Sequence, residues 1–108
     1  MNAPQHAGLA AGRWAQMSLL QQLGNVGGEV SRAARWEGKD PAQRDRAVVR
    51  ALELLDLTLA DPRWARRLKE LARARELLCD AWLGGLEYRT RLSDMDRYFF
   101  QIALAARR

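Results

Sequence analysis

The residue types best suited to catalysis or metal binding are scarce in this sequence and stand far apart. His6 is the single histidine and Cys79 the single cysteine. A zinc centre needs three or four Cys and His ligands, and a nucleophilic cysteine needs a base close by. The sequence therefore predicts no metal site and no cofactor, and Cys79 is expected to be a buried structural thiol.

Two other kinds of site lack their motifs. A di-iron helical bundle carries Glu-x-x-His pairs, and none occurs here. The glycine-rich segment 24–28 has neither the preceding strand nor the following lysine of a phosphate-binding loop. We therefore expect a protein that binds a partner and is not an enzyme.

Basic side chains form the surface that we expect to bind a partner. The chain has 18 Lys and Arg against 13 Asp and Glu, a formal charge of +5. An excess of this kind favours a polyanionic partner. Arg66, Lys69 and Arg73 follow an i, i+3, i+7 spacing and so share one helix face. The residues predicted to contact nucleic acid are Arg63, Arg66, Arg67, Lys69 and Arg73, with Arg44, Arg46, Arg107 and Arg108.

Two other interpretations of these cations stay open at this stage. The first is a solvated helix face with internal pairs such as Arg66 with Glu70. The second is a surface for an acidic protein partner.

Acidic residues inside the apolar stretches predict structural ion pairs. Counted outward from the turn at 38–39, Glu29 comes level with Arg50. Asp56 stands in an apolar run, and a buried carboxylate must be paired, so Arg66 or Arg67 is its expected partner. A role in a subunit interface is the alternative.

Glycines in the first helix require a reason, since each costs a helix about 1 kcal/mol relative to alanine. Gly24 and Gly28 are four residues apart and share a face. We expect another helix, of this chain or of a second subunit, to pack closely there. A kink in the helix is the alternative.

The elements that position these residues are helices. Apolar residues recur at helical spacing over 13–36, 41–60, 62–83 and 93–107. Asp40-Pro41 and Asp61-Pro62 are typical helix starts, whereas Gly38 and Gly84-Gly85 are typical stops. Ser93 and Asp96 resemble a capping box.

These ranges predict an all-α fold, an antiparallel up-down-up-down four-helix bundle with a shorter fourth helix. A three-helix bundle with a docked tail helix is the alternative. Residues 1–12 are expected to be a flexible tail and 13–108 a single domain. The unpaired cysteine, the lack of a signal-peptide pattern and the lack of a long apolar run lead us to expect a cytoplasmic protein without membrane contact.

Three consecutive aromatic residues suggest self-association. Tyr98, Phe99 and Phe100 span about 200° of a helix and cannot all face one core. At least one is available to a neighbouring subunit, so a homo-oligomer is expected.

Three stretches of the chain carry a family resemblance. The runs from Met17 to Arg32, from Arg50 to Thr58 and from Leu68 to Glu76 are similar to a group of short bacterial proteins. This group resembles the four-helix bundles of the 23S rRNA intervening-sequence class, which includes the accessory variability determinant of diversity-generating retroelements.

The resemblance implies a pentameric barrel that binds RNA or DNA and a reverse transcriptase, and that supports mutagenic reverse transcription. It transfers no individual residue, because binding in that family is spread over basic surface. The two functions expected are therefore a non-enzymatic nucleic-acid-binding accessory protein, or a protein-interaction scaffold with an acidic partner and no nucleic acid.

Overall fold

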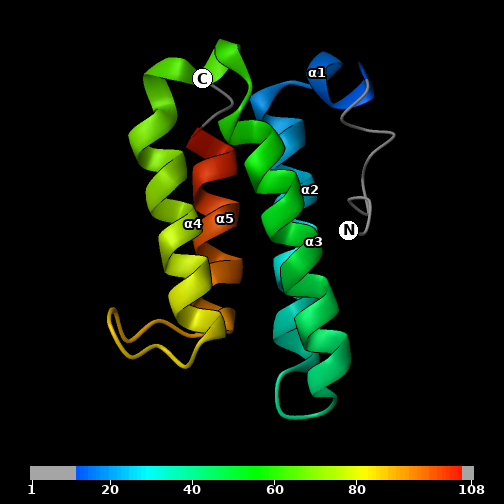
Figure 1. The fold of residues 1–108 in the computed structure, drawn as a ribbon, viewed down its shortest axis with the longest axis vertical. Coiled ribbons are helices and arrows are strands. Elements are labelled where there is room, and N and C mark those ends of the chain that lie inside the picture. Colours follow the sequence, from blue (N-terminus) through cyan, green and yellow to red (C-terminus); the bar gives the residue numbers. More distant parts are fainter. Residues whose placement is uncertain (1–11, 106–108) are drawn as a thin grey trace, which may run out of the picture.

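The structure, a computed structural model, describes residues 12–105, and all of its regular elements are helical (Figure 1). Most of the expected tail lies outside the described residues, as do Arg107 and Arg108. The elements in chain order are α1 (Trp14–Gln16), α2 (Leu19–Trp36), α3 (Pro41–Leu59), the 3₁₀ helix η2 (Pro62–Arg67), α4 (Leu68–Trp82) and α5 (Leu92–Ala105). The prediction of an all-α chain is confirmed.

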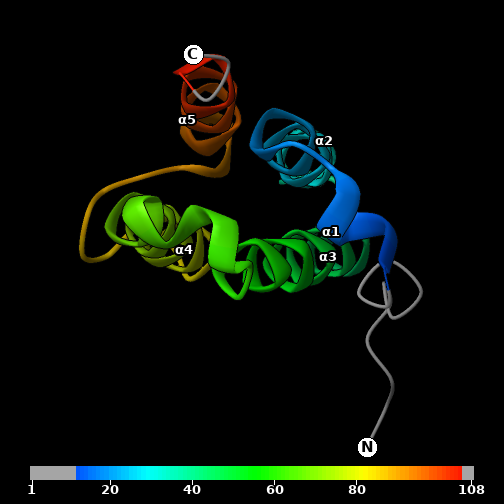
Figure 2. The same ribbon diagram turned by 90° about the horizontal axis from the view of Figure 1, so that it is seen from above.

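The four long helices enclose one core. Seen end-on, α2 lies beside α3 and α5, and α4 lies beside the same two helices, so that α2 and α4 stand at opposite corners (Figure 2). None of the helices within residues 12–105 combines the length and the apolar character that a membrane span requires.

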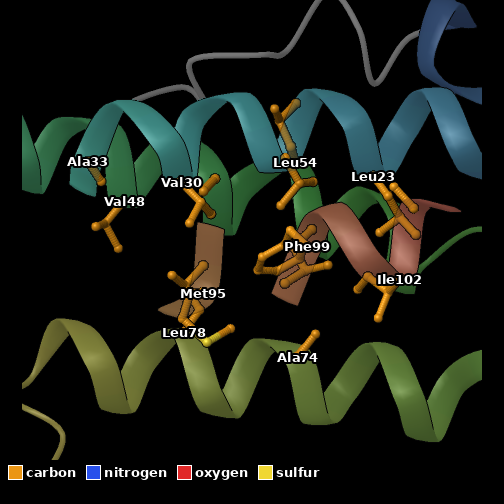
Figure 3. Close-up of a cluster of buried hydrophobic side chains, with 14 of the residues drawn as sticks. Leu23, Val30, Ala33, Val48, Leu54, Ala74, Leu78, Met95, Phe99 and Ile102 are labelled. Carbon is orange, nitrogen blue, oxygen red and sulfur yellow. The ribbon is translucent and has the colours of Figure 1, made fainter. Parts of the chain in front are cut away.

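Side chains from all four helices fill the space between them (Figure 3). Those with at most 1% of their surface exposed include Leu23, Val26, Val30, Val48, Leu55, Leu71, Leu78, Met95 and Phe99. Their burial is the main favourable contribution to folding, because each removes a large apolar side chain from water.

Two helix starts follow the Asp-Pro signals of the sequence. The Asp40 carboxylate accepts hydrogen bonds from the backbone N–H groups of Ala42 (3.1 Å) and Gln43 (3.3 Å). The Asp61 carboxylate accepts one from the backbone N–H of Arg63 (3.0 Å). Proline follows each cap as the first helical residue. An N–H group at this position would have no hydrogen-bond acceptor within the helix, so its absence in proline costs nothing.

The first predicted helix, 13–36, is interrupted, and its prediction as one element was wrong. Met17 has an extended backbone (ψ 147°) that separates α1 from α2. Ser18 then caps α2: its Oγ accepts from the Gln21 N–H at 3.1 Å, and the Gln21 side chain accepts from the Ser18 N–H at 2.9 Å. This reciprocal capping box stabilises a helix start at Leu19.

The third and fourth predicted helices also begin elsewhere. Residues 62–67 form a 3₁₀ helix in which Trp64 leaves helical geometry (φ −106°, ψ 21°), so α4 starts only at Leu68. In α5, the Asp94 carboxylate accepts from the backbone N–H of Arg91 at 3.0 Å. The helix therefore starts one residue earlier than predicted, at Leu92, and Ser93 lies inside its first turn.

Close packing at Gly24 and Gly28 does not occur within the chain, which overturns that part of the prediction. A Cβ atom at either position would meet nothing within 4 Å. Gly27 instead faces α5, with the Phe99 Cβ 3.5 Å from the position its own Cβ would take. Nor do these glycines break α2, which is continuous through all of them.

Three glycine substitutions test this assignment. Gly24→Ala and Gly28→Ala should each raise the free energy of unfolding by about 0.8–1 kcal/mol, because both sites are open and helical. Gly85→Ala should lower it by more than about 1 kcal/mol. Gly85 has a φ of +71°, and its Cβ would lie 2.6 Å from the Thr90 carbonyl oxygen. Urea denaturation measures all three. A loss of stability in Gly24→Ala that grows with protein concentration would place this face in a subunit contact.

Candidate nucleic-acid interface

The cations of α4 and of the 3₁₀ helix before it divide into two groups. Arg66, Lys69 and Arg73 are exposed, and none forms a salt bridge with a residue in the range 12–105. We call these three residues the α4 basic face. Lys69 and Arg73, four residues apart, share one side of α4. Arg66 lies in the last turn of η2, just before this helix.

The neighbouring arginines are held by carboxylates. The Arg67 Nη2 lies 3.3 Å from the Glu70 Oε1, so Arg67 and not Arg66 takes this partner. The Arg75 Nε lies 2.7 Å from the Asp56 Oδ1. These guanidinium groups are therefore less available to a ligand than those of the α4 basic face.

The expected environment of Asp56 was wrong. Its side chain is 53% exposed, and its partner is Arg75 on α4. The reason is the 3₁₀ helix, which carries the chain across from α3 to α4 (Figure 2). Because Arg66 and Arg67 lie at that crossing, the residue of α4 that comes level with Asp56 is Arg75.

Glu29 and Arg50 are brought together, as the helical register predicted. The Arg50 Nε lies 2.6 Å from the Glu29 Oε2, and the two side chains are only 23% and 15% exposed, in that order. The Arg32 Nη1 lies 2.9 Å from the other oxygen of the same carboxylate. One carboxylate thus links α2 to α3 and leaves a local excess of positive charge.

The basic residues near the start of α3 lie on a different helix from the α4 basic face. The Arg44 Nε donates to the Asp45 Oδ1 at 3.0 Å, and the Trp82 indole N–H donates to the same oxygen at 2.9 Å. The Trp82 bond, followed by that of Arg44, lowers the pKa of the Asp45 carboxyl group. Arg46 is exposed. The predicted nucleic-acid residues therefore do not form one continuous site.

Two tyrosines lie close to the α4 basic face. The Arg73 guanidinium lies 5.8 Å from the centre of the Tyr88 ring, within the range of a cation–π contact. Burial raises the pKa of Tyr98 on α5, as does the Glu70 charge, whereas the Arg73 charge acts in the opposite direction. Cations interleaved with aromatic rings are typical of surfaces that bind nucleic acid.

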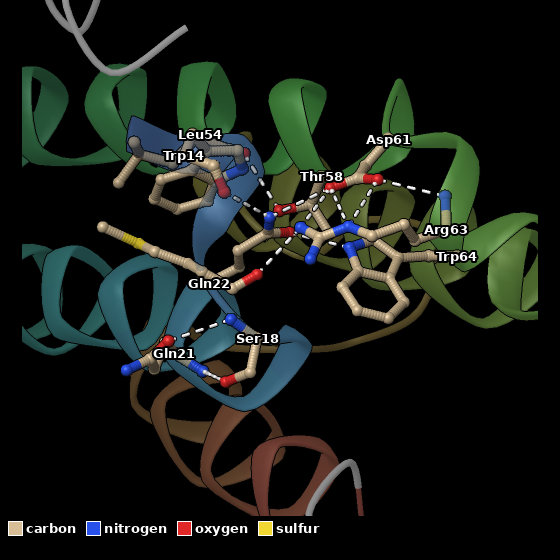
Figure 4. A network of polar contacts seen from close by, with 10 residues as sticks. Trp14, Ser18, Gln21, Gln22, Leu54, Thr58, Asp61, Arg63 and Trp64 are labelled. Atoms are coloured by element: carbon tan, nitrogen blue, oxygen red, sulfur yellow. Dashed lines mark hydrogen bonds and ion pairs between the residues drawn. The ribbon is translucent and has the colours of Figure 1, made fainter. Parts of the chain in front are cut away.

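A buried polar network fixes the 3₁₀ helix that precedes this face (Figure 4). The Gln22 side chain is fully buried. Its Nε2 donates to the Trp14 carbonyl oxygen at 2.9 Å and to the Asp61 Oδ2 at 3.2 Å, while its Oε1 accepts from the Trp64 indole N–H at 3.0 Å. All the hydrogens and one oxygen lone pair of this amide are thereby used.

Arg63 belongs to this network and not to the open basic surface. Its Nη2 lies 2.7 Å from the Asp61 Oδ2 and donates to the Met17 carbonyl oxygen at 2.8 Å. Its guanidinium also lies 4.5 Å from the centre of the Trp64 ring. Arg63 thus has a structural role, and its guanidinium is less available to nucleic acid than those of the α4 basic face.

A further cluster of cations was missed in the sequence. Arg32, Arg35 and Lys39 surround Trp36 at the end of α2 and line a surface hollow of about 450 Å³. The signal was the spacing Arg-x-x-Arg-Trp-x-x-Lys, which places cations three or four residues apart around one aromatic residue.

In the described part of the chain, no group of three or more His, Cys, Asp or Glu side chains is placed to hold a metal ion. Cys79 is only partly buried. It borders a mixed-charge depression that also includes Arg75, Glu76 and Asp80.

Comparison with known proteins yields no family model, curated protein or solved structure that matches this chain. The resemblance to the intervening-sequence class stays a prediction from the sequence.

Acid titration tests the buried network. The Arg63 guanidinium holds the pKa of Asp61 at about 2, below its ordinary 3.8. Since the folded-state pKa is depressed, the stabilisation is complete above pH about 4 and is lost as the pH falls toward about 2. Asp61→Asn should lower the free energy of unfolding at neutral pH by about 2 kcal/mol, and the difference from wild type should close over that interval.

Asp56→Asn is the matched control, measured by urea denaturation over the same pH range. Its salt bridge has the same 2.7 Å N–O distance, but the Asp56 side chain is 53% exposed against 7% for Asp61. An exposed pair contributes at most about 1 kcal/mol. Equal losses in the two variants would contradict the structural role given to the Gln22–Asp61 network.

Proposed function

We propose that this chain is a non-enzymatic protein that binds nucleic acid, RNA in the first place, through the α4 basic face. The observation that carries the proposal is the contrast within one segment. Arg63, Arg67 and Arg75 are engaged by carboxylates, whereas Arg66, Lys69 and Arg73 are exposed without a salt bridge in the described part of the chain.

Phosphate groups are the ligand that suits the three exposed cations of the α4 basic face. A merely solvated helix face gains from i, i+4 pairing, which the α4 basic face does not have. Lysine and arginine at this spacing can each contact a phosphate and release a counterion. The nearby ring of Tyr88, which is 40% exposed, adds flat apolar surface against which a base can stack.

The wider setting is part of the same proposal. The scaffold is the antiparallel up-down-up-down four-helix bundle, and the single cysteine suits a cytoplasmic location. The resemblance seen in the sequence supports a pentameric accessory protein that partners a reverse transcriptase in a diversity-generating retroelement. Self-association is supported by α5, where Phe100 is 65% exposed and Leu104, one turn later, is 43% exposed.

The alternative function is a protein-interaction scaffold with an acidic partner and no nucleic acid. The same exposed pair, Phe100 and Leu104, favours it, because large apolar side chains on one face of a helix are typical of protein contacts.

Salt-dependent RNA binding tests the proposal. The triple variant Arg66→Gln, Lys69→Gln, Arg73→Gln should bind a structured RNA at least about tenfold more weakly at low salt. Loss of three phosphate contacts should also reduce the slope of log K against log salt concentration by about 2 to 3. Fluorescence anisotropy with labelled RNA, repeated over a series of salt concentrations, measures both.

The control removes the same charge from other positions: Arg13→Gln, Arg91→Gln, Arg97→Gln. These arginines are all exposed and stand next to α1, next to α5 and on α5. The control should keep most of the affinity and the slope. Equal losses of affinity in both triple variants would show that binding depends on net charge alone and not on the α4 basic face. A wild-type protein that does not bind RNA at low salt would favour the scaffold function.

A further inference from the structure

The hollow around Trp36 combines an exposed aromatic ring with positive charge. Trp36 is the last residue of α2 and is 38% exposed. Its carbonyl oxygen accepts hydrogen bonds from the backbone N–H groups of Lys39 (2.9 Å) and Asp40 (3.0 Å). Gly38, with a φ of +79°, permits this tight turn. Lys39, which follows this turn, lines the hollow together with Trp36.

The charges around this hollow are not balanced. Glu29 is shared by Arg32 and Arg50, at 2.9 and 2.6 Å, so two cations already neutralise its single charge. Arg35 and Lys39 are exposed and form no salt bridge within residues 12–105. Cations near a helix C-terminus stabilise the helix dipole, but that role does not require an exposed tryptophan between them.

We infer that this hollow binds an unpaired nucleotide of single-stranded nucleic acid, with the base stacked on Trp36 and the phosphate held by Arg35 and Lys39. An inorganic phosphate would use only the cations. A base offers a flat ring to the indole, which is the usual way in which single strands are held. The volume of about 450 Å³ is of the size of small-molecule sites, about 300–1,000 Å³.

This inference rests on the proposed nucleic-acid function and adds a second site to it. The α4 basic face and the Trp36 hollow belong to α4 and α2, which stand at opposite corners of the bundle (Figure 2). Stacking requires a base whose face is free, so the Trp36 hollow selects single strands, whereas the α4 basic face contacts phosphates of any strand.

Trp36 variants test the site against three probes. These are a single-stranded RNA oligonucleotide, the same oligonucleotide annealed to its complement, and a single strand with abasic positions. Trp36→Ala should bind the single strand about tenfold more weakly and the duplex as wild type does. Trp36→Phe should recover most of the loss, since it restores a ring. The abasic strand should bind wild type and Trp36→Ala equally.

The phosphate contacts are tested by Arg35→Gln, Lys39→Gln, with Arg89→Gln, Arg97→Gln as the charge-matched control. The first pair should reduce the salt slope for the single strand by about 1.4, and the control pair should leave it near the wild-type value. Thermal unfolding of each variant shows whether a change in binding reflects a lower stability of the protein, caused by loss of the cations at the end of α2.

The outcomes separate the two proposals. If Trp36→Ala binds the single strand as wild type does, or loses affinity for single strand and duplex equally, the inference is overturned. The proposed function then stands or falls by the α4 triple variant. A wild-type protein that binds none of the three probes at low salt overturns both proposals.

Discussion

The buried amide of Gln22 is the constraint on which the arrangement of the remaining chain depends. A buried amide without partners costs several kcal/mol. Gln22 finds its partners in two segments: Trp14 in α1, and Asp61 and Trp64 at the start of η2. Each of these contacts fixes a connection and not a core helix. The short α1, the break at Met17 and the 3₁₀ helix η2 are therefore positioned by polar contacts in addition to the apolar packing of Trp14 and Trp64, whereas α2 to α5 are held mainly by apolar packing.

The register between α3 and α4 follows from this constraint. Because Trp64 and Arg63 are tied to α2 and Asp61, residues 62–67 cross between helices and cannot extend α4 as an ordinary first turn. Arg75 then comes level with Asp56, and Arg66 is left without that carboxylate. The open charge of the α4 basic face is thus a consequence of where η2 ends.

Local signals in the sequence were sufficient for part of this fold. Asp40-Pro41 and Asp61-Pro62 predict helix starts because cap and proline act within three residues. The capping box of Ser18 and Gln21 is equally local and could have been found. The 3₁₀ geometry of 62–67 could not, because it depends on Trp64 reaching Gln22, 42 residues away. The partner of Asp56 could not be predicted either, because it depends on where α4 starts relative to α3. Helical spacing within one segment does not give that register.

The distribution of carboxylates decides which surfaces can attract an anion and which can pack against protein. Glu29 and Asp56 bind arginines where two helices meet, so positive charge remains on the outer side of α4 and at the end of α2. Like charges on these surfaces oppose self-association there. The outer side of α5, with Phe100 and Leu104 exposed, carries apolar area instead. In the proposed function, a subunit contact through α5 would leave both basic surfaces open, so that the residues proposed for nucleic-acid binding and those proposed for self-association are different ones.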